Sequence, residues 1–149
     1  MRVGLVASSG GHLSQLHALA PCFSSDARRW VTFDTPHARA LLDGERITFA
    51  HQPTNRHLGN LARNAVLAAR WIRRERPELV VSTGAGVGVP FLWAARAAGI
   101  KTVFVEVFDR IDGPSLTGRL VAPVVDLVVL QRDAQRAIYP RGVVLGAAR

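Results

Sequence analysis

The sequence predicts an α/β fold, a doubly wound and mostly parallel sheet with helices on both faces. Short apolar runs of strand length alternate with longer stretches of helical periodicity along the chain. Three of the runs, 79–81, 103–105 and 127–130, are continuously apolar, which is typical of parallel strands that helices cover on both faces. The length of 149 residues suits one domain, and there is no linker or internal repeat, so we expect residues 1–149 to form a single Rossmann-like domain.

The alternation predicts six strands and six helices in turn. We expect strands at 2–7, 29–35, 46–50, 78–83, 101–107 and 126–131. We expect helices near 11–21, 36–43, 57–76, 88–98, 115–122 and 132–138. Pro77 ends the longest helix because proline lacks the backbone N–H that a helix interior needs, and Gly99 stands where a helix end favours a left-handed residue.

Composition restricts the classes of function. Hydrophobic residues make up 48% of the chain and charged residues 20%, which is an ordinary globular balance. The single cysteine, Cys22, excludes an internal disulfide and a cysteine-rich zinc site, and the histidines show no ligand spacing, so we expect no metal. No apolar run approaches the roughly 18 residues of a membrane-spanning helix, and the cytoplasm is therefore the expected compartment.

The charge balance favours anionic partners. The net charge is +8, because 18 arginines and the single lysine, Lys101, outnumber 11 acidic residues. Such an excess attracts phosphates, nucleic acid or acidic lipid surfaces. Of these we expect phosphate groups and an anionic membrane surface, and no nucleic acid.

Four loops at the carboxyl ends of the expected strands form one candidate site. In a doubly wound sheet, ligands bind beyond these ends, near the point where the strand order reverses. Each of the loops carries glycine or polar residues. They are 8–12, 83–88, 107–115 and, more weakly, 131–133.

The first of these loops contains Ser9, Gly10, Gly11 and His12. Its glycines allow backbone N–H groups to approach a phosphate or a sugar hydroxyl, although a tight turn with no ligand remains the alternative. A neutral imidazole at the mouth of the loop could exchange a proton with a substrate, or His12 could be an ordinary partly exposed residue. Because Gly10 and Gly11 are adjacent, the spacing departs from the dinucleotide fingerprint G-x-G-x-x-G, although Asp34 lies where a ribose-binding acid would be.

The loops after the fourth and fifth strands add further candidates. Gly84 and Gly86 provide a second set of backbone amides that face the strand ends. Glu106 ends an apolar strand, where a carboxylate must be hydrogen-bonded or solvated. It is therefore either a ligand or base residue, or an internal partner of Arg110 or Arg119. Ser115 is expected to cap the short helix that follows.

The long helix at 57–76 predicts a membrane-facing surface. Its sheet-facing stripe is expected to consist of Leu58, Leu61, Ala62, Ala65, Ala69 and Ile72. On this interpretation Leu67 and Trp71 lie on the outer side, flanked by Arg63, Arg70 and Arg74. Apolar side chains among arginines suit an anionic membrane surface, whereas cover by a neighbouring loop or a partner chain is the alternative.

The order of the motifs resembles a known family. The segments are SSGGHLSQL, STGAGVGVP, VFVEVFDRIDGPSLTGRL, PVVDLVVLQ and YPRGVVLGA. Together they resemble the Alg-fourteen family and its bacterial exopolysaccharide relatives of the PssD type, over residues 2–147. Three departures are visible: the N-terminal membrane helix of eukaryotic members is missing, Arg132 stands where tryptophan often follows Gln131, and Ala85 stands where proline is frequent.

The resemblance implies the acceptor-side, N-terminal half of a GT-B glycosyltransferase of the UDP-N-acetylglucosamine type. A separate Alg-thirteen-like or PssE-like subunit would bind the UDP-sugar donor, with no other cofactor, and the pair would act at the inner face of the cytoplasmic membrane. By resemblance to the related MurG enzymes, the loop from Ser9 to His12 would face the sugar and diphosphate of a lipid-linked acceptor. Glu106 and Arg110 match the family's acid and arginine in the fifth-strand loop.

The candidate site thus comprises two sets of residues. His12 and Glu106 are the catalytic candidates. The acceptor-binding candidates are Ser9, Gly10, Gly11, Gly84, Gly86, Arg110 and Ser115. Size supports the resemblance independently, because a GT-B enzyme needs two Rossmann-like domains and 149 residues supply one. The alternative is a stand-alone Rossmann-type protein that binds NAD or another nucleotide.

Overall fold

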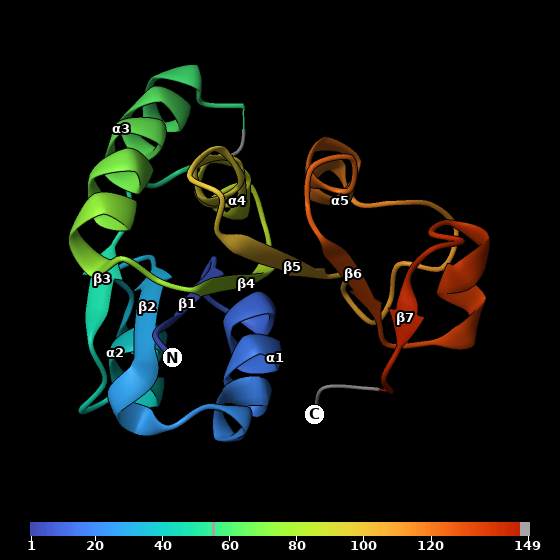
Figure 1. Cartoon of the computed structure of the whole chain (residues 1–149), viewed down its shortest axis with the longest axis horizontal. Coiled ribbons are helices and arrows are strands. Elements are labelled where there is room, and N and C mark those ends of the chain that lie inside the picture. Colours follow the sequence, from blue (N-terminus) through green and yellow to red (C-terminus); the bar gives the residue numbers. More distant parts are fainter. Residues whose placement is uncertain (55, 147–149) are drawn as a thin grey trace.

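Seven parallel strands form one sheet in the computed structural model, which describes residues 1–54 and 56–146 (Figure 1). The strands are β1 (Val3–Ala7), β2 (Arg28–Thr32), β3 (Ile47–Phe49), β4 (Leu79–Gly84), β5 (Lys101–Val105), β6 (Leu127–Leu130) and β7 (Val143–Val144). Their order across the sheet is β3-β2-β1-β4-β5-β6-β7, so the order reverses between β1 and β4. The predicted doubly wound α/β fold is confirmed.

Helices cover both faces of the sheet. The α-helices are α1 (Gly11–Leu19), α2 (Pro36–Leu41), α3 (Leu58–Glu75), α4 (Gly88–Ala97) and α5 (Leu116–Val121). Three short 3₁₀ helices join them, namely η1 (Ala20–Cys22), η2 (Ser25–Ala27) and η3 (Asp133–Ala137). Figure 1 shows α3, α4 and α5 on one face of the sheet, with α1 and α2 on the other. Each face therefore has its own apolar core, one built around Phe91 and Phe104 and the other around Leu5 and Leu13.

The predicted elements are present with small changes at their ends. All six expected strands form, and the expected helix at 132–138 is the 3₁₀ helix η3. The strand β7 was not predicted, because a two-residue strand that pairs only with the end of β6 leaves no periodic pattern. The predicted helix ends are confirmed: α3 stops at Glu75, before Pro77, and Gly99 adopts a φ of +73° just beyond α4.

The predicted orientation of α3 is wrong. Trp71, which we placed on the outer side, is 1% exposed and packs edge-on against Phe91 of α4, with ring centroids 5.6 Å apart. Leu67 is half-buried and packs against the same core. In contrast, Leu58 is 80% exposed, and Leu61, Ala62, Ala65 and Ala69 are also exposed. Of the predicted stripe only Ile72, 7% exposed, is buried, so the helix is rotated about its axis relative to the prediction and the rest of the stripe faces outward.

Two buried asparagines explain the rotation. Asn64 is 1% exposed; its Oδ1 accepts a hydrogen bond from the backbone N–H of His51, at 2.8 Å, and its Nδ2 donates to the His51 carbonyl. Asn60 is 4% exposed and donates from Nδ2 to the carbonyl of Pro53 at 2.8 Å. These bonds satisfy the backbone of the loop that precedes α3, so polar side chains belong on the inner face of the helix. A periodicity argument that counts only apolar residues misses this arrangement.

Among the described residues, no helix is both long enough and apolar enough to cross a membrane.

Candidate functional site

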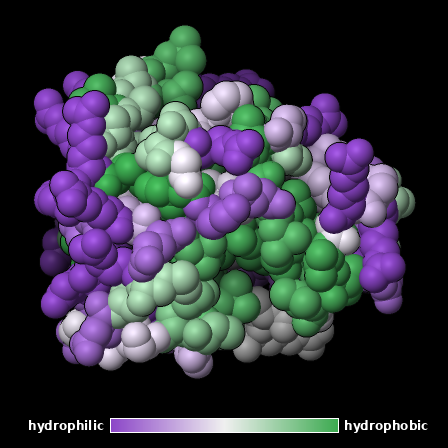
Figure 2. All heavy atoms as spheres, in the orientation of Figure 1, coloured by the Kyte–Doolittle hydropathy of each residue, from purple (hydrophilic) through white to green (hydrophobic). Residues whose placement is uncertain are grey.

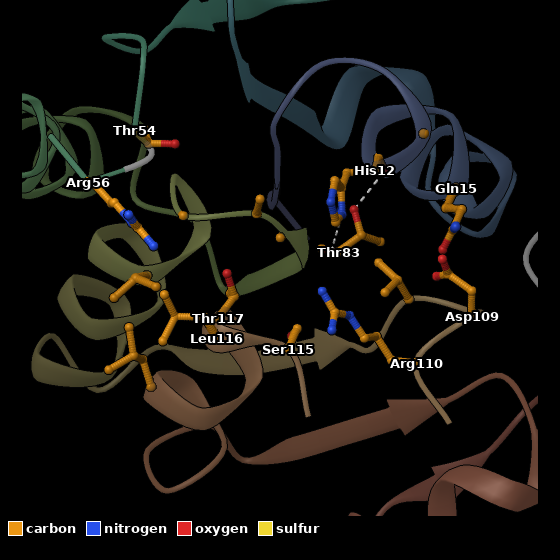
Figure 3. A pocket seen from close by; sticks show the side chains of 17 residues that line it. His12, Gln15, Thr54, Arg56, Thr83, Asp109, Arg110, Ser115, Leu116 and Thr117 are labelled. Atoms are coloured by element: carbon orange, nitrogen blue, oxygen red, sulfur yellow. Dashed lines mark hydrogen bonds between the residues drawn. The ribbon is translucent and has the colours of Figure 1, made fainter. Parts of the chain in front are cut away.

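An open pocket of about 900 Å³ lies at the carboxyl edge of the sheet, where the strand order reverses (Figure 3). Three of the four predicted loops line it, those after β1, β4 and β5. The loop between β3 and α3 and the first turns of α5 complete the wall. The lining residues are Gly11, His12, Gln15, Thr54, Arg56, Thr83, Gly84, Ala85, Gly86, Val89, Val107, Asp109, Arg110, Ser115, Leu116, Thr117 and Leu120.

The two glycine loops are bonded to each other at the base of the pocket. The N–H of Ser8 donates to the carbonyl of Gly84 at 2.9 Å, and the Thr83 hydroxyl donates to the carbonyl of His12 at 2.6 Å. Gly84 has a φ of +96°, and a Cβ at this position would lie 3.5 Å from the His12 ring. The positive φ favours glycine at position 84, whereas the ring would be in ordinary van der Waals contact with a Cβ.

The His12 ring is held in a defined orientation. Its Nδ1 lies 2.9 Å from the carbonyl oxygen of Thr83. A carbonyl only accepts hydrogen bonds, so in the neutral ring Nδ1 carries the proton and Nε2 carries the lone pair. Because the ring lines the pocket, Nε2 can take a proton from a substrate hydroxyl, which is the geometry that a general base needs.

Glu106 lies behind the pocket rather than in its lining. The residue is fully buried, and its Oε2 accepts hydrogen bonds from the N–H and the hydroxyl of Ser115, at 3.2 and 3.0 Å, and from the Tyr139 hydroxyl at 2.5 Å. Its Oε1 accepts from the N–H of Val107. The partners are thus Ser115 and Tyr139, in place of the arginines at 110 and 119 that we considered. We therefore propose that Glu106 positions the loop that lines the pocket, rather than contacting a substrate.

Gln135, which lies further along the chain in η3, anchors the same loop. It is fully buried in η3, and its Nε2 donates to the carbonyls of Val107 and Arg110 at 2.7 and 3.1 Å. Ser115 in turn caps α5, because its Oγ accepts a hydrogen bond from the N–H of Gly118 at 2.9 Å, as the sequence predicted. Glu106 and Gln135, both fully buried, therefore fix the backbone of the loop that carries Arg110.

The Tyr139 contact predicts an unusual alkaline titration. Burial, and then the hydrogen bond to the Glu106 carboxylate, raise the pKa of Tyr139. Because the pKa in the folded state is above the unfolded value of ~10, Tyr139 contributes fully to the free energy of unfolding below about pH 10. That contribution is lost as the pH rises further. Because Tyr139 is the only tyrosine, absorbance near 295 nm should show no tyrosinate until the protein unfolds. A titration with a midpoint near ~10 in the folded protein would contradict this, and Tyr139→Phe is the control.

Most of the predicted binding residues meet at the pocket. Gly11, Gly84, Gly86, Arg110 and Ser115 line it, whereas Ser9 and Gly10 lie in the first loop outside the lining. The role of all seven residues in binding an acceptor stays a prediction. Asp34, the candidate ribose-binding acid, is outside the pocket and paired with Arg39, whose hydrogen bond lowers the pKa of the carboxyl. Among the described residues, no three His, Cys, Asp or Glu side chains gather in a way that could hold a metal ion.

The β3–α3 loop, above all Thr54 and Arg56, also lines the pocket and was not predicted from the sequence. This loop follows the edge strand β3, which is two strands away from β1, where the strand order reverses. It reaches the pocket because Asn60 and Asn64 hold its backbone, and a Cβ added to Gly86 would lie 3.2 Å from the Thr54 hydroxyl oxygen. One sequence signal could have predicted this loop at the pocket: it is polar, and the helix that follows has asparagines on its inner face.

The fold and the pocket together define a Rossmann-like domain with an open pocket at the topological switch point, the point where the strand order reverses. The crystal structure of MurG from Acinetobacter baumannii superposes on it with a TM-score of 0.79 and 17% sequence identity, covering 100% of this chain and 46% of MurG. The shared fold is the N-terminal half of a GT-B protein. At the level of sequence, residues 45–148 match the family described as "Oligosaccharide biosynthesis protein Alg14 like", and the chain belongs to that family.

Individual relatives agree with this assignment. The human "UDP-N-acetylglucosamine transferase subunit ALG14" is 25% identical over 173 residues, which cover 95% of this chain and 80% of the human protein. The "UDP-N-acetylglucosamine--N-acetylmuramyl-(pentapeptide) pyrophosphoryl-undecaprenol N-acetylglucosamine transferase" of Chlorobaculum tepidum is 34% identical over 82 residues, which cover 55% of this chain but 22% of the enzyme. The chain thus spans most of the human subunit and less than half of the MurG structure.

Proposed function

We propose that this chain is the acceptor-side subunit of a two-component glycosyltransferase that acts on a lipid-linked sugar. Residues 1–149 form the acceptor domain, and a separate subunit binds a UDP-sugar such as UDP-N-acetylglucosamine. The observation that carries the proposal is the pocket at the switch point, in which His12 presents Nε2 beside two glycine loops. Membership in the Alg14-like family supports the reaction class.

In this proposal His12 removes the proton from the acceptor hydroxyl as that oxygen bonds to the anomeric carbon of the donor sugar. The bond from that carbon to the phosphate oxygen of UDP breaks, and UDP leaves on the donor-binding subunit. The Thr83 carbonyl holds the ring in the tautomer that leaves Nε2 free to accept. Backbone amides of the two glycine loops and the side chain of Arg110 bind the acceptor. The nucleotide-binding alternative is weaker, because Asp34 is paired with Arg39 away from the pocket.

The partner requirement gives the direct test. The purified chain alone is expected to show no sugar transfer to a short-chain lipid-linked acceptor, and activity is expected when the donor-binding subunit is added. The physical reason is that a GT-B reaction needs a donor domain opposite the acceptor domain. A radiolabelled UDP-sugar assay with each subunit alone and with both measures this. Robust transfer by this chain alone would overturn the proposal.

Membrane recruitment is proposed through the outer face of α3. This face carries the exposed apolar residues Leu58, Leu61, Ala62, Ala65, Val66 and Ala69, with Arg63, Arg70 and Arg73 beside them. Figure 2 shows apolar surface at the upper end of α3 and hydrophilic side chains along its flank. Apolar residues with flanking arginines suit an anionic bilayer surface. This surface replaces the one centred on Trp71, which is in the core.

Vesicle sedimentation tests the α3 surface. Because each basic residue contributes ~1 kcal/mol near an anionic bilayer, R63E combined with R70E should weaken binding to acidic vesicles at least about tenfold. The parent chain should sediment with acidic vesicles and not with neutral ones. R136E with R141E is the charge-matched control and should bind like the parent, because η3 and the turn before β7 lie at the end of the sheet remote from α3 (Figure 1). Equal binding by both double variants would exclude α3 as the membrane-facing surface.

A further inference from the structure

Two arginines face each other across the pocket from separate loops. Arg56 belongs to the β3–α3 loop and Arg110 to the β5–α5 loop, and both line the pocket. Figure 3 shows the two guanidinium ends directed toward the middle of the pocket from opposite sides. We infer that Arg56 and Arg110 form a clamp that binds the diphosphate of a lipid-linked sugar, one guanidinium to each phosphate. This inference rests on the proposed function and names the residues that would select its substrate.

Neither guanidinium is paired with a carboxylate among the described residues. Six arginines form ion pairs with Asp or Glu, namely Arg28, Arg29, Arg39, Arg74, Arg96 and Arg136. Arg56 and Arg110 form none within the part of the chain that the structure describes, although Asp109 lies in the same pocket. Figure 3 shows Asp109 beside Gln15 rather than between the arginines. The two facing guanidiniums therefore present positive charge that no described carboxylate pairs with.

The presence of two guanidiniums, one on each wall, favours a diphosphate over a single phosphate or a carboxylate. A guanidinium binds one phosphate best as a planar fork with two parallel hydrogen bonds. Two such forks on opposite walls of a pocket of about 900 Å³ suit a ligand with two linked anionic centres. The backbone of Arg110 is held by Gln135, at 3.1 Å, so this side of the clamp is positioned before a ligand arrives.

The walls on either side of the clamp differ in polarity, which points to a lipid diphosphate. One wall carries His12 and Gln15, groups suited to sugar hydroxyls. The other carries Leu116, 72% exposed, and Leu120, 45% exposed. Arg56 also lies two residues before Leu58, the first residue of the outer α3 surface. A substrate with a sugar, a diphosphate and an apolar chain in sequence would meet polar, cationic and apolar surface in the same order.

Binding by the whole chain, without its partner, tests the clamp separately from transfer. The probes for calorimetry are farnesyl diphosphate, farnesyl monophosphate, inorganic pyrophosphate and UDP. The parent should bind farnesyl diphosphate at least about tenfold more tightly than each of the other three. R56Q and R110Q should each weaken farnesyl diphosphate binding by about 10- to 100-fold and remove the preference over the monophosphate. R136Q is the matched control and should bind like the parent, with thermal unfolding of every variant as the check on folding.

The affinities of the variants and of the four probes decide whether the two arginines form a diphosphate clamp. R110K, which keeps the charge but loses the fork, should recover only part of the affinity. Equal parent affinity for the diphosphate and the monophosphate, no binding of farnesyl diphosphate, or unchanged affinity in both glutamine variants would overturn the clamp. Tighter binding of UDP would identify a nucleotide as the ligand and would also overturn it. If the clamp behaves as expected but the reconstituted pair transfers no sugar, the proposed function fails and the diphosphate site remains.

Discussion

Replacing His12 with alanine is expected to lower kcat for sugar transfer by the reconstituted pair by about 10²–10⁴-fold, the usual contribution of a general base. The reason is the ring geometry, with Nδ1 bonded to the Thr83 carbonyl and Nε2 left with the lone pair in the pocket. The free energy of unfolding should change little, because the ring is only partly buried. Steady-state kinetics and urea unfolding of the same preparation measure the two effects.

Two comparisons separate chemistry from structure in this experiment. His37 is exposed and outside the pocket, so His37→Ala should leave transfer unchanged. Glu106→Ala should lower both activity and stability, because it removes the acceptor of the Ser115 and Tyr139 hydrogen bonds in a fully buried place. If His12→Ala keeps kcat within about threefold of the parent, His12 only binds or only supports the loop.

Replacing Trp71 with alanine is expected to destabilise the domain by about 3–5 kcal/mol, the range for removing a buried aromatic side chain. Trp71 is 1% exposed, packs on Phe91, and lies so close to β1 that a Cβ at Gly4 would be 2.5 Å from its ring. A loss of this size is a large fraction of the roughly 5–15 kcal/mol that holds a domain folded. Urea unfolding followed by circular dichroism measures it.

Trp93 provides the matched control for this prediction. It is 48% exposed, and its indole N–H donates to the carbonyl of Leu120. Trp93→Ala should therefore cost about 1 kcal/mol or less. Trp71→Phe keeps part of the packing, so it gives a folded variant if the alanine variant does not fold. Equal small losses for Trp71→Ala and Trp93→Ala would mean that Trp71 is not a core residue.

Much of the candidate site followed from the sequence because parallel strands place their carboxyl ends at one edge. The loops containing His12, Gly84 and Arg110 could be assigned to one site without knowing any distance. Glu106 could not be placed in the same way. A carboxylate at a strand end faces either the pocket or the interior, and its hydrogen bonds to Ser115 and to Tyr139, 33 residues further along, settle the choice.

The sequence by itself determined the α/β class, the six principal strands, the glycine loops at the switch point and the ends of the helices. These features depend on local signals, namely apolar periodicity, proline, glycine and capping residues, which act within a few residues of where they stand. The tertiary structure alone decided the orientation of α3, the approach of Arg56 to the pocket and the burial of Glu106. Each of these depends on which polar group satisfies which distant backbone or side-chain atom. The hydrogen bonds between Asn64 and the His51 backbone set the orientation of α3, and the Tyr139 hydroxyl donates a hydrogen bond to the buried Glu106. A buried polar group needs a hydrogen-bond partner, which can come from a distant part of the chain.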